Sequence, residues 1–349
     1  MNSTKLLCLM MVFLFASVCL AQEVFESVEG TFSTRKLSDK KEMNGTNKLL
    51  IRAAANLPGE ITVNTSKAKE VTINYYKKAK SDDRKKGIDF IDLIAVVLDK
   101  TPDGIRLEMR APNPAPWSGN YEWGMIEARI TVPENCYIDI NAAQFDVTAD
   151  GPFRAVVISK SLGRIEVSNV LEKLDVATSN RRVNVNDISG DISISTTNAV
   201  LNARNLVSVG SRSHLENEHG DIRVDGFTGE IEIENSYGRI HLGAFNARGK
   251  RNVIRGMSGP ISLEIIQLND AQLRVTNRFD DVEINLPGSA SAALSLAVDE
   301  GGKIEVSNFN VKPELIAQNR MNLVAGKGSS IISSNVRGSG NIYIRGNND

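Results

Sequence analysis

Cysteine is scarce in this sequence, and its positions exclude a fold held together by disulfides. Of the three cysteines, only Cys136 lies beyond the first 21 residues. If those residues are removed, as argued below, no intramolecular disulfide can form, so burial and hydrogen bonding must supply the stability. An exported chain of this length without disulfides is more typical of a bacterial envelope than of a eukaryotic secretory route.

Histidine is equally rare, which leaves little material for a catalytic or metal centre. The three histidines are His214, His219 and His241. A zinc site needs three or four converging ligands, and His214 could join His219 and a nearby glutamate only if the chain folds back there. The sequence has no Gly-x-Ser-x-Gly motif, and no histidine lies near Cys136. We therefore expect no catalytic residue, no metal and no cofactor.

Neither sign of charge predominates, and long apolar runs are missing from most of the chain. The 41 basic residues nearly balance the 42 acidic ones, whereas nucleic acid or an anionic membrane as main partner would call for a concentrated basic surface. We expect neither. Beyond the first 21 residues the longest apolar stretch is Leu93 to Leu98, too short to cross a membrane, so no transmembrane segment is expected in the mature chain.

The first 21 residues predict a signal peptide. Lys5 precedes an apolar run from Leu6 to Val18, and Cys19-Leu20-Ala21 then offers the small residues that signal peptidase requires. We therefore expect an exported protein of the periplasm, the cell surface or the extracellular space. A lipidated Cys19 is disfavoured, because residues 16–18 lack the leucine and the adjacent small residue of a lipoprotein signal.

The sequence is rich in one short pattern that recurs every nine residues. Gly, a polar residue, Ile, a polar residue and then Val, Ile or Leu follow one another three times between Leu215 and Leu242. This alternation predicts strands of about five residues with one dry face and one solvated face. Including these three, units begin at Gly163, Glu172, Arg181, Gly190, Gly220, Gly229, Gly238, Ala271 and Asp280, with isolated units at Gly259, Gly302 and Gly340.

Each unit ends in a corner where asparagine is frequent. Asparagine and glycine tolerate left-handed backbone, and the asparagine side chain can also satisfy the amides of a turn. We expect both roles at the seventh position of the units, which is occupied by Asn169, Asn217, Asn235, Asn277 and Asn308.

Such units can build two architectures. An antiparallel meander does not require neighbouring units to share a sequence phase, whereas a parallel β-solenoid stacks equivalent positions at about 4.8 Å and drives the sequence toward self-similarity. The shared phase favours an all-β, parallel β-solenoid. With two units in a coil, residues 18 apart are stacked, which pairs Glu166 with Asn184, Asp175 with Ser193 and Arg223 with His241. Longer corners or a third strand are expected where the pattern is interrupted, at residues 199–219, 243–258, 286–301 and 310–339.

The part before the repeats is β-rich but irregular. We divide the chain into a signal peptide (1–21), a capping region (22–145) and a solenoid (146–349), with one continuous domain as the alternative to the last two. The capping region and the closing strand Asn341 to Arg345 are expected to cover the open ends of the solenoid. Strands are predicted within the capping region at Ile61–Ile73, Ile88–Leu98, Ile105–Met109, Met125–Val132 and Tyr137–Ile140, with breaks at 77–87 and 111–119.

Several motifs together resemble a known family. They are the repeats G-D-I-S-I, G-D-I-R-V, G-E-I-E-I and G-R-I-H-L, the strand I-T-V-P-E-N before them and the final G-S-G-N-I-Y-I-R-G. They resemble the bacterial putative-adhesin family of β-strand-repeat proteins, a domain of unknown function related to the head domain of GIN-type proteins. The resemblance covers Leu49 to Gly346 and implies an exported, all-β, solenoid-like protein with no established reaction.

One segment concentrates the large aromatic residues. Residues 111–123 contain both tryptophans of the chain and a tyrosine beside a proline-rich run. Trp117, Tyr121 and Trp123 are therefore candidates for a surface that stacks on a sugar or on a partner chain. The alternative, which we favour, is that this loop folds over the end of the β stack and that its rings close the core.

Together these features predict an exported, non-catalytic scaffold or adhesin-like binding surface of the bacterial envelope. Its partner would be an envelope protein or a glycan, held by many weak contacts along a rigid ladder, and no motif fixes an oligomeric state. The alternative is a polysaccharide lyase or hydrolase. Its carboxylates would come from Asp280, Asp281 and Glu283 or from Asp299 and Glu300, although the repeat frame gives the first three structural positions.

Overall fold

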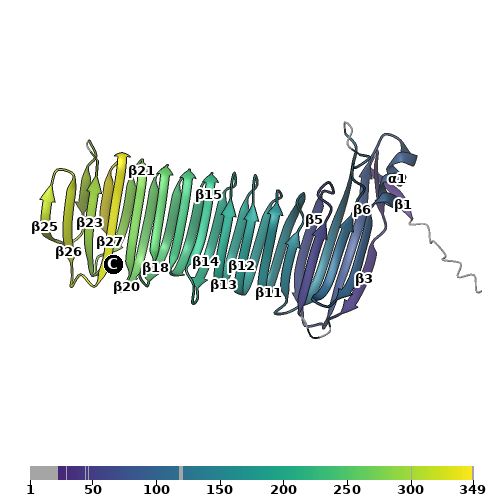
Figure 1. Ribbon diagram of the computed structural model, residues 1–349, viewed down its shortest axis with the longest axis horizontal. Coiled ribbons are helices and arrows are strands. Elements are labelled where there is room, and N and C mark those ends of the chain that lie inside the picture. The colour runs from purple at the N-terminus through teal and green to yellow at the C-terminus, as the bar shows by residue number, and fades with distance from the viewer. Residues whose placement is uncertain are drawn as a thin grey trace, which may run out of the picture.

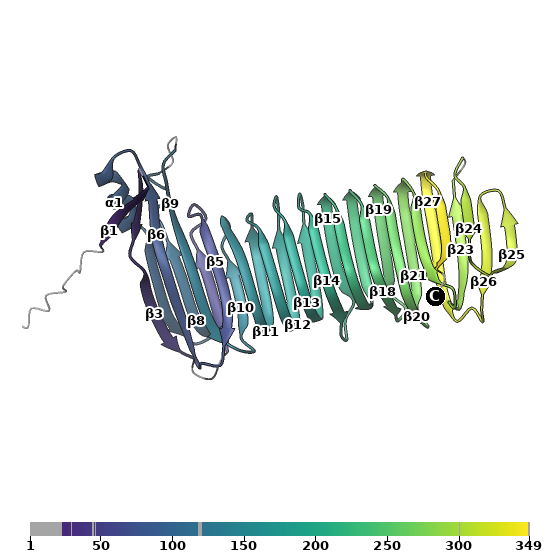
Figure 2. The same cartoon turned by 180° about the vertical axis from the view of Figure 1, so that it is seen from behind.

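The protein is an elongated stack of β-strands (Figures 1 and 2). The computed structural model describes residues 23–28, 30–43, 45, 47–117, 121–299 and 301–347. Its 28 strands form one hydrogen-bonded sheet that winds into coils, and neighbouring repeats pair in parallel. The prediction of an all-β, parallel solenoid is therefore confirmed. The predicted signal peptide lies outside the described residues. None of the helices in the described ranges is long and apolar enough to span a membrane.

The central coils follow the register that the nine-residue repeat predicts. Glu166 pairs with Asn184, Asp175 with Ser193 and Arg223 with His241. The strands of this part, which alternate buried and solvated side chains, are β11 (Phe145–Ser161), β12 (Ile165–Thr178), β13 (Val183–Thr196), β14 (Leu201–Ser208), β15 (Ser213–His219), β16 (Ile222–Gly229), β17 (Ile231–Tyr237), β18 (Ile240–Arg248), β19 (Asn252–Ser258), β20 (Ile261–Asn269), β21 (Gln272–Phe279) and β22 (Val282–Pro287).

Some coils are longer than two units, as the interruptions predicted. Ser193 pairs with His214, and Glu232 pairs with Val253, so these partners are more than 18 positions apart. The additional residues lie in the turns after β14 and β18, where Gly210 and Gly249 adopt positive φ angles of 76° and 66°. The β ladder passes these turns without a break, because the insertions stay in the corners.

Glycine marks the corner where successive coils come closest. Gly220, Gly238 and Gly259 occupy equivalent corners and have φ angles of 112°, 144° and 119°. A Cβ atom on Gly238 would lie 2.3 Å from the Gly220 carbonyl oxygen, and one on Gly259 would lie 2.4 Å from that of Gly238. A side chain at Gly238 or Gly259 would push against the preceding coil, so glycine permits the close stacking at these two corners. The equivalent corner of the next coil is occupied by Asp280, with a φ angle of 82°.

The corner asparagines divide into two kinds. Asn169 and Asn308 adopt left-handed backbone with φ angles of 59° and 52°, as predicted. Asn217, Asn235 and Asn277 instead point into the core and are only 1–3% exposed. Their Nδ2 groups donate to turn carbonyls: Asn217 to Ala199 at 2.7 Å, Asn235 to Gly220 at 2.9 Å and Asn277 to Gly259 at 3.0 Å. The expectation that they serve turn amides was wrong for Asn217 and Asn235, but the Oδ1 of Asn277 accepts a hydrogen bond from the Arg278 N–H at 3.0 Å, as predicted.

At the N-terminal end the order of the coils along the stack differs from their order in the sequence. The coil of β4 (Lys48–Ala53) and β5 (Gly59–Ser66) lies between a coil of β8 (Gly104–Arg110) and β9 (Trp123–Pro133) and a coil of β10 (Tyr137–Asn141) and β11. Antiparallel strands extend this end beyond β8 and β9. They are β1 (Val24–Val28), β2 (Thr31–Thr34), β3 (Leu37–Glu42), β6 (Glu70–Lys80) and β7 (Ala95–Thr101).

Three predictions for this part were wrong in detail. The predicted strand at 88–98 is half helix, because Asp83 caps α1 (Arg84–Leu93) by accepting a hydrogen bond from the Lys86 N–H at 3.0 Å. The predicted strand at 61–73 is two strands with a reversal after Ser66. The predicted break from residue 77 begins later, because β6 stays paired with β9 as far as Lys80.

The C-terminal end also departs from chain order. β23 (Ala292–Val298) and β24 (Ile304–Ser307) form an outer coil, and β27 (Ser330–Ser339) and β28 (Ile342–Asn347) return to lie between it and the coil of β21 and β22. The hairpin of β25 (Lys312–Ala317) and β26 (Arg320–Ala325) extends past β23. The expectation that Asn341–Arg345 closes the end was wrong, because β28 has a paired neighbour on both sides.

The apolar interior runs the length of the stack. One cluster of buried side chains extends from Phe32 at one end to Ile344 at the other. It crosses the proposed boundary near residue 145, where β11 pairs with β5 on one side and with β12 on the other. This continuity favours the single-domain alternative, and the division into two domains remains a prediction.

Candidate functional site

Cys136 lies in a setting that opposes thiol chemistry. The residue is fully buried, and its Sγ lies 3.6 Å from the carbonyl oxygen of Tyr137. Burial raises the pKa of the Cys136 thiol to about 12, because the thiolate would lose its hydration. A thiol of this kind stays protonated at neutral pH and does not act as a nucleophile.

The acidic groups considered for a lyase or hydrolase hold the coils together. Asp281 accepts hydrogen bonds from the backbone N–H and the Nδ2 of Asn341, at 2.8 and 2.9 Å. Glu283 pairs with Arg345 at 2.9 Å across adjacent coils. Asp280 stands at a corner with a φ angle of 82°, as the repeat frame predicted.

The second acidic group is similar where it is described. Asp299 accepts a hydrogen bond from the Gly338 N–H at 2.8 Å, while Glu300 lies outside the described residues. Within the described ranges no group of three or more His, Cys, Asp or Glu side chains is placed to hold a metal ion.

The three histidines lie apart on the solvated surface. His214 stands between Glu216 and Glu232, 3.6 Å from a carboxylate oxygen of each. His219 stacks on Tyr237 in the next coil, with ring centroids 4.8 Å apart and planes 18° apart. His241 lines a groove on another face, described below. Among the described residues, the structure therefore does not bring His214 and His219 together with Glu216 or Glu218 as a metal-binding group.

The aromatic loop does not form one exposed surface. Trp117 is 6% exposed, and its ring packs edge-on against Phe90 of α1 with centroids 5.7 Å apart. Tyr121 is 86% exposed and has a φ angle of 69°, while Trp123 is half-buried at the start of β9. Residues 118–120 lie outside the described residues. Trp117 thus packs in the core, and a binding role for Tyr121 and Trp123 remains a prediction.

A long polar groove lies on the face formed by the first strand of each coil. We call it the first-face groove; its volume is about 900 Å³. Two columns of side chains follow its length, each member paired with the next across adjacent strands. The first column consists of Thr148, Glu166, Asn184, Asn202, Arg223 and His241, and the second of Asp150, Ser168, Asn186, Arg204 and Asp225.

Hydrogen bonds between coils hold some of these side chains in place. Asn202 donates from Nδ2 to the Oδ1 of Asn184 at 3.0 Å, and Ser168 donates from Oγ to Asp150 at 2.6 Å. Because strands in a sheet are about 4.8 Å apart, the columns present donors and acceptors at a regular spacing. The groove therefore offers a preorganised polar track.

Sequence reasoning assigned these residues to the solvated face but did not identify a site there. The signal was present in the 18-residue stacking, which brings Glu166 beside Asn184 and Arg223 beside His241. The stacking pattern does not predict that this face is concave, because the concavity depends on how each coil bends. The bends lie at Asn169 and at the equivalent Asp187 and Asn205, which all have positive φ angles.

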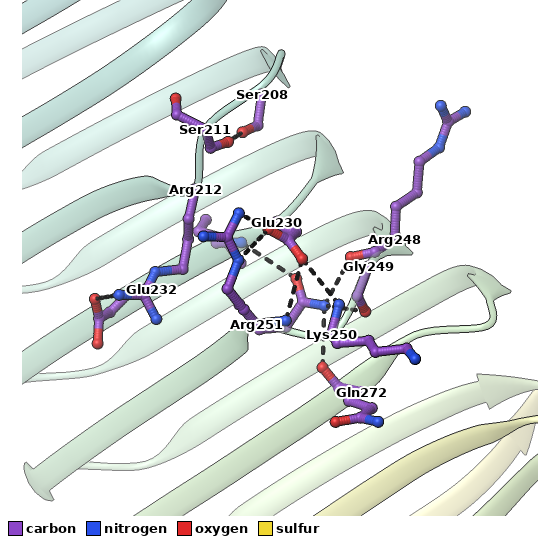
Figure 3. A network of polar contacts seen from close by, with 12 residues as sticks. Ser208, Ser211, Arg212, Glu230, Glu232, Arg248, Gly249, Lys250, Arg251 and Gln272 are labelled. Atoms are coloured by element: carbon purple, nitrogen blue, oxygen red, sulfur yellow. Dashed lines mark hydrogen bonds and ion pairs between the residues drawn. The ribbon is translucent and has the colours of Figure 1, made fainter.

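The second face carries a charged cluster around an inserted turn (Figure 3). The carboxylate of Glu230 accepts hydrogen bonds from the backbone N–H groups of Lys250 and Arg251, at 2.8 and 3.2 Å, and from the Arg251 Nε at 2.8 Å. Burial acts to raise the pKa of Glu230, but these hydrogen bonds outweigh it and the pKa lies below its ordinary value. The cluster fixes the turn between β18 and β19, so a structural role accounts for it.

Similar proteins are known by sequence profile and by structure. The structures of proteins described as putative adhesins from Parabacteroides distasonis and Bacteroides fragilis are 9% and 12% identical, with TM-scores of 0.34 and 0.31, and each match covers 89% of this chain and 97% of the other. A putative cell adhesion protein from Clostridium sporogenes is 12% identical with a TM-score of 0.22, over 90% of this chain and 99% of the other. Likenesses this distant carry no argument about function.

No curated protein matches the sequence at a significant level. The Toastrack DUF4097 family, by contrast, matches residues 47–302, from the inserted coil of β4 through the outer coil at β23. That range holds the repeat units from Gly163 to the one that begins at Asp280, and both columns of the first-face groove. The chain belongs to the Toastrack DUF4097 family.

Proposed function

We propose that this protein is an exported, non-catalytic β-solenoid of the bacterial envelope that acts as a scaffold or adhesin-like binding surface. The observation that supports this most directly is the pair of polar columns in the first-face groove, held in register over successive coils. Export rests on the N-terminal sequence, in which Lys5 and the apolar run to Val18 have the pattern of a signal peptide.

The groove fits an extended polar polymer better than a compact small molecule. Its lining mixes amides, carboxylates and guanidinium groups, as at Asn184, Asp225 and Arg204, and such groups complement the hydroxyls of a glycan. A chain of sugars lying along the columns would repeat the same contacts from coil to coil. Individually weak contacts then add up, because the first one holds the rest of the polymer close to the surface.

The mature chain should be tested on arrays of envelope glycans and in pull-downs from native envelopes. Asn184→Ala combined with Asn202→Ala removes two neighbouring amide side chains from the first column of the groove. The double variant should bind about tenfold more weakly, because it loses roughly one net hydrogen bond to the ligand together with the adjoining contacts. A matched control is Asn246→Ala with Asn269→Ala, because Asn269 donates to Asn246 across coils at 2.9 Å outside the groove. The control should bind like the wild type.

Three outcomes would count against the proposal. If no glycan or envelope protein is retained, the binding role fails. If both double variants lose binding equally, the groove is not the site. If a retained polysaccharide is shortened during the assay, the protein is an enzyme rather than a binding surface.

A further inference from the structure

A second groove crosses the coils near the C-terminal end, on the face formed by β19, β21 and β27. Its volume is about 780 Å³, and we call it the arginine groove. β21 pairs in parallel with β19 on one side and with β27 on the other. Its charged and aromatic lining consists of Arg255, Arg274, Arg278, Arg337, Asp299 and Phe279.

The charge of this groove is positive, although the charges of the whole chain nearly cancel. Arg255 is committed to Glu232 at 2.8 Å and also pairs with Glu234. Arg274, Arg278 and Arg337 are in no ion pair with any described carboxylate. Asp299 is the acidic side chain among the described lining residues, and it accepts a hydrogen bond from the Gly338 N–H. Three guanidinium groups therefore remain available to an anion.

An exposed ring lies beside these guanidinium groups. Phe279 is 41% exposed, and the guanidinium of Arg278 lies over it at 5.2 Å from the ring centroid. The same column of the sheet continues through Ser258 to Tyr237, which is 49% exposed and stacks on His219. Large exposed rings are uncommon in a chain with 5% aromatic residues, so this column supplies apolar faces next to the positive charge.

We propose that the arginine groove binds a carboxylated saccharide, such as a segment of a polyuronic acid. Arginine recognises carboxylates with paired hydrogen bonds from its planar fork, and the face of a sugar ring packs on an aromatic side chain such as Phe279. Arg278 and Arg337 lie at the same end of the paired strands β21 and β27, and Arg274 lies four residues before Arg278 on β21, about 13 Å away along the strand, so carboxylates spaced along an extended saccharide can each meet an arginine. A nucleic acid is disfavoured, because its backbone calls for a longer basic track than three free guanidinium groups.

The test is a calorimetric titration of the full mature chain with a hexauronate, a neutral hexasaccharide of equal length and a single-stranded oligonucleotide, each at the same two salt concentrations. The hexauronate should bind and the other two should not. Arg274→Gln combined with Arg337→Gln should raise its Kd about tenfold or more, since each substitution removes a charge-assisted contact. Phe279→Ala alone should also weaken hexauronate binding, but the dependence of the Kd on salt should stay as in the wild type, because this substitution removes no charge.

A matched control removes the same charge elsewhere. Arg248 and Arg320 are exposed and line neither groove, so Arg248→Gln with Arg320→Gln should change the Kd less than twofold. All variants should keep the wild-type Tm and circular dichroism, because the substituted side chains lie at the surface. The Asn184 and Asn202 variant should bind hexauronate normally, which separates this site from the first-face groove.

The proposal is overturned if hexauronate binds no better than the neutral hexasaccharide, or if the oligonucleotide binds as tightly. Equal losses in the groove variant and in the control would also overturn it, because the effect would then come from net charge alone. If the Arg274 and Arg337 double variant fails to fold, Arg278→Gln alone gives the same comparison against Arg248→Gln.

Discussion

Substituting one corner glycine tests how tightly the coils are stacked. Gly238 has a φ angle of 144°, and a Cβ atom there would lie 2.3 Å from the carbonyl oxygen of Gly220 in the coil below. Forcing alanine into this region of backbone costs about 1–3 kcal/mol, and moving the coils apart to relieve the contact costs about as much again. We therefore expect Gly238→Ala to lose about 4 kcal/mol in total.

The expected change is measurable by thermal unfolding. Because the entropy of unfolding is about 2 cal/mol/K per residue, a loss of this size lowers the Tm by about 6 °C in a chain of this length. Gly210→Ala is the matched control, since Gly210 also has positive φ, at 76°, but no neighbouring atom within 4 Å of the added Cβ. It should cost only the backbone strain of about 1 kcal/mol, or roughly 2 °C. Equal falls in Tm for the two variants would refute the reasoning.

Three further predictions concern single buried or half-buried side chains. Glu230→Gln should lower the free energy of unfolding by about 2 kcal/mol at pH 7. Because the folded-state pKa of Glu230 lies below its ordinary value of 4.5, the wild type should be the more stable protein above pH 4.5 and should lose this advantage as the pH falls through the folded-state pKa. A stability difference that does not change with pH would contradict this prediction. Cys136 should resist a thiol reagent at pH 8 until the protein unfolds, and rapid labelling of the native protein would contradict its burial. Trp117→Ala should cost about 3–5 kcal/mol, because its ring packs on Phe90; an unchanged Tm would return Trp117 to the candidates for a surface site.

The central register could be predicted because its causes are local and repeated. Alternation with a period of two fixes which side chains face inward, and a shared phase between units fixes which residues stack, as Glu166 and Asn184 do. Glycine at the corners had a local cause as well, since only glycine allows the approach seen at Gly238. The all-β parallel architecture follows from these two features together.

The ends could not be predicted in the same way, because their order depends on pairing between distant segments. β4 lies between β8 and β10, and β28 lies between β22 and β24. Nothing in the short patterns of these strands specifies a neighbour so far along the chain. The arrangement places a coil within the stack at each end, so its strands are paired on both sides. The edge is left to antiparallel strands at the N-terminal end, and to β24 and the hairpin of β25 and β26 at the C-terminal end.

The grooves were missed for a related reason. Alternation shows that Asn184 and Arg274 face solvent, but a groove depends on the bends that follow each strand and on the coils on either side.

In the aromatic loop, by contrast, the sequence pointed to a candidate surface residue that the structure buries. Its composition drew attention to Trp117, whose burial depends on the position of α1 and therefore on a helix that the pattern at 88–98 did not reveal.

The most direct measurement of the central claim is disulfide formation between engineered cysteines in a Cys136→Ala background. In a parallel solenoid Glu166 and Asn184 are paired neighbours in adjacent coils, so Glu166→Cys with Asn184→Cys should cross-link readily under mild oxidation. Glu166→Cys with Asp175→Cys should not, because Asp175 belongs to the following segment of the same coil and pairs with Ser193 instead. Cross-linking of 166 with 184 alone is the predicted result; no cross-link there, or equal cross-linking of 166 with 175, would contradict the account.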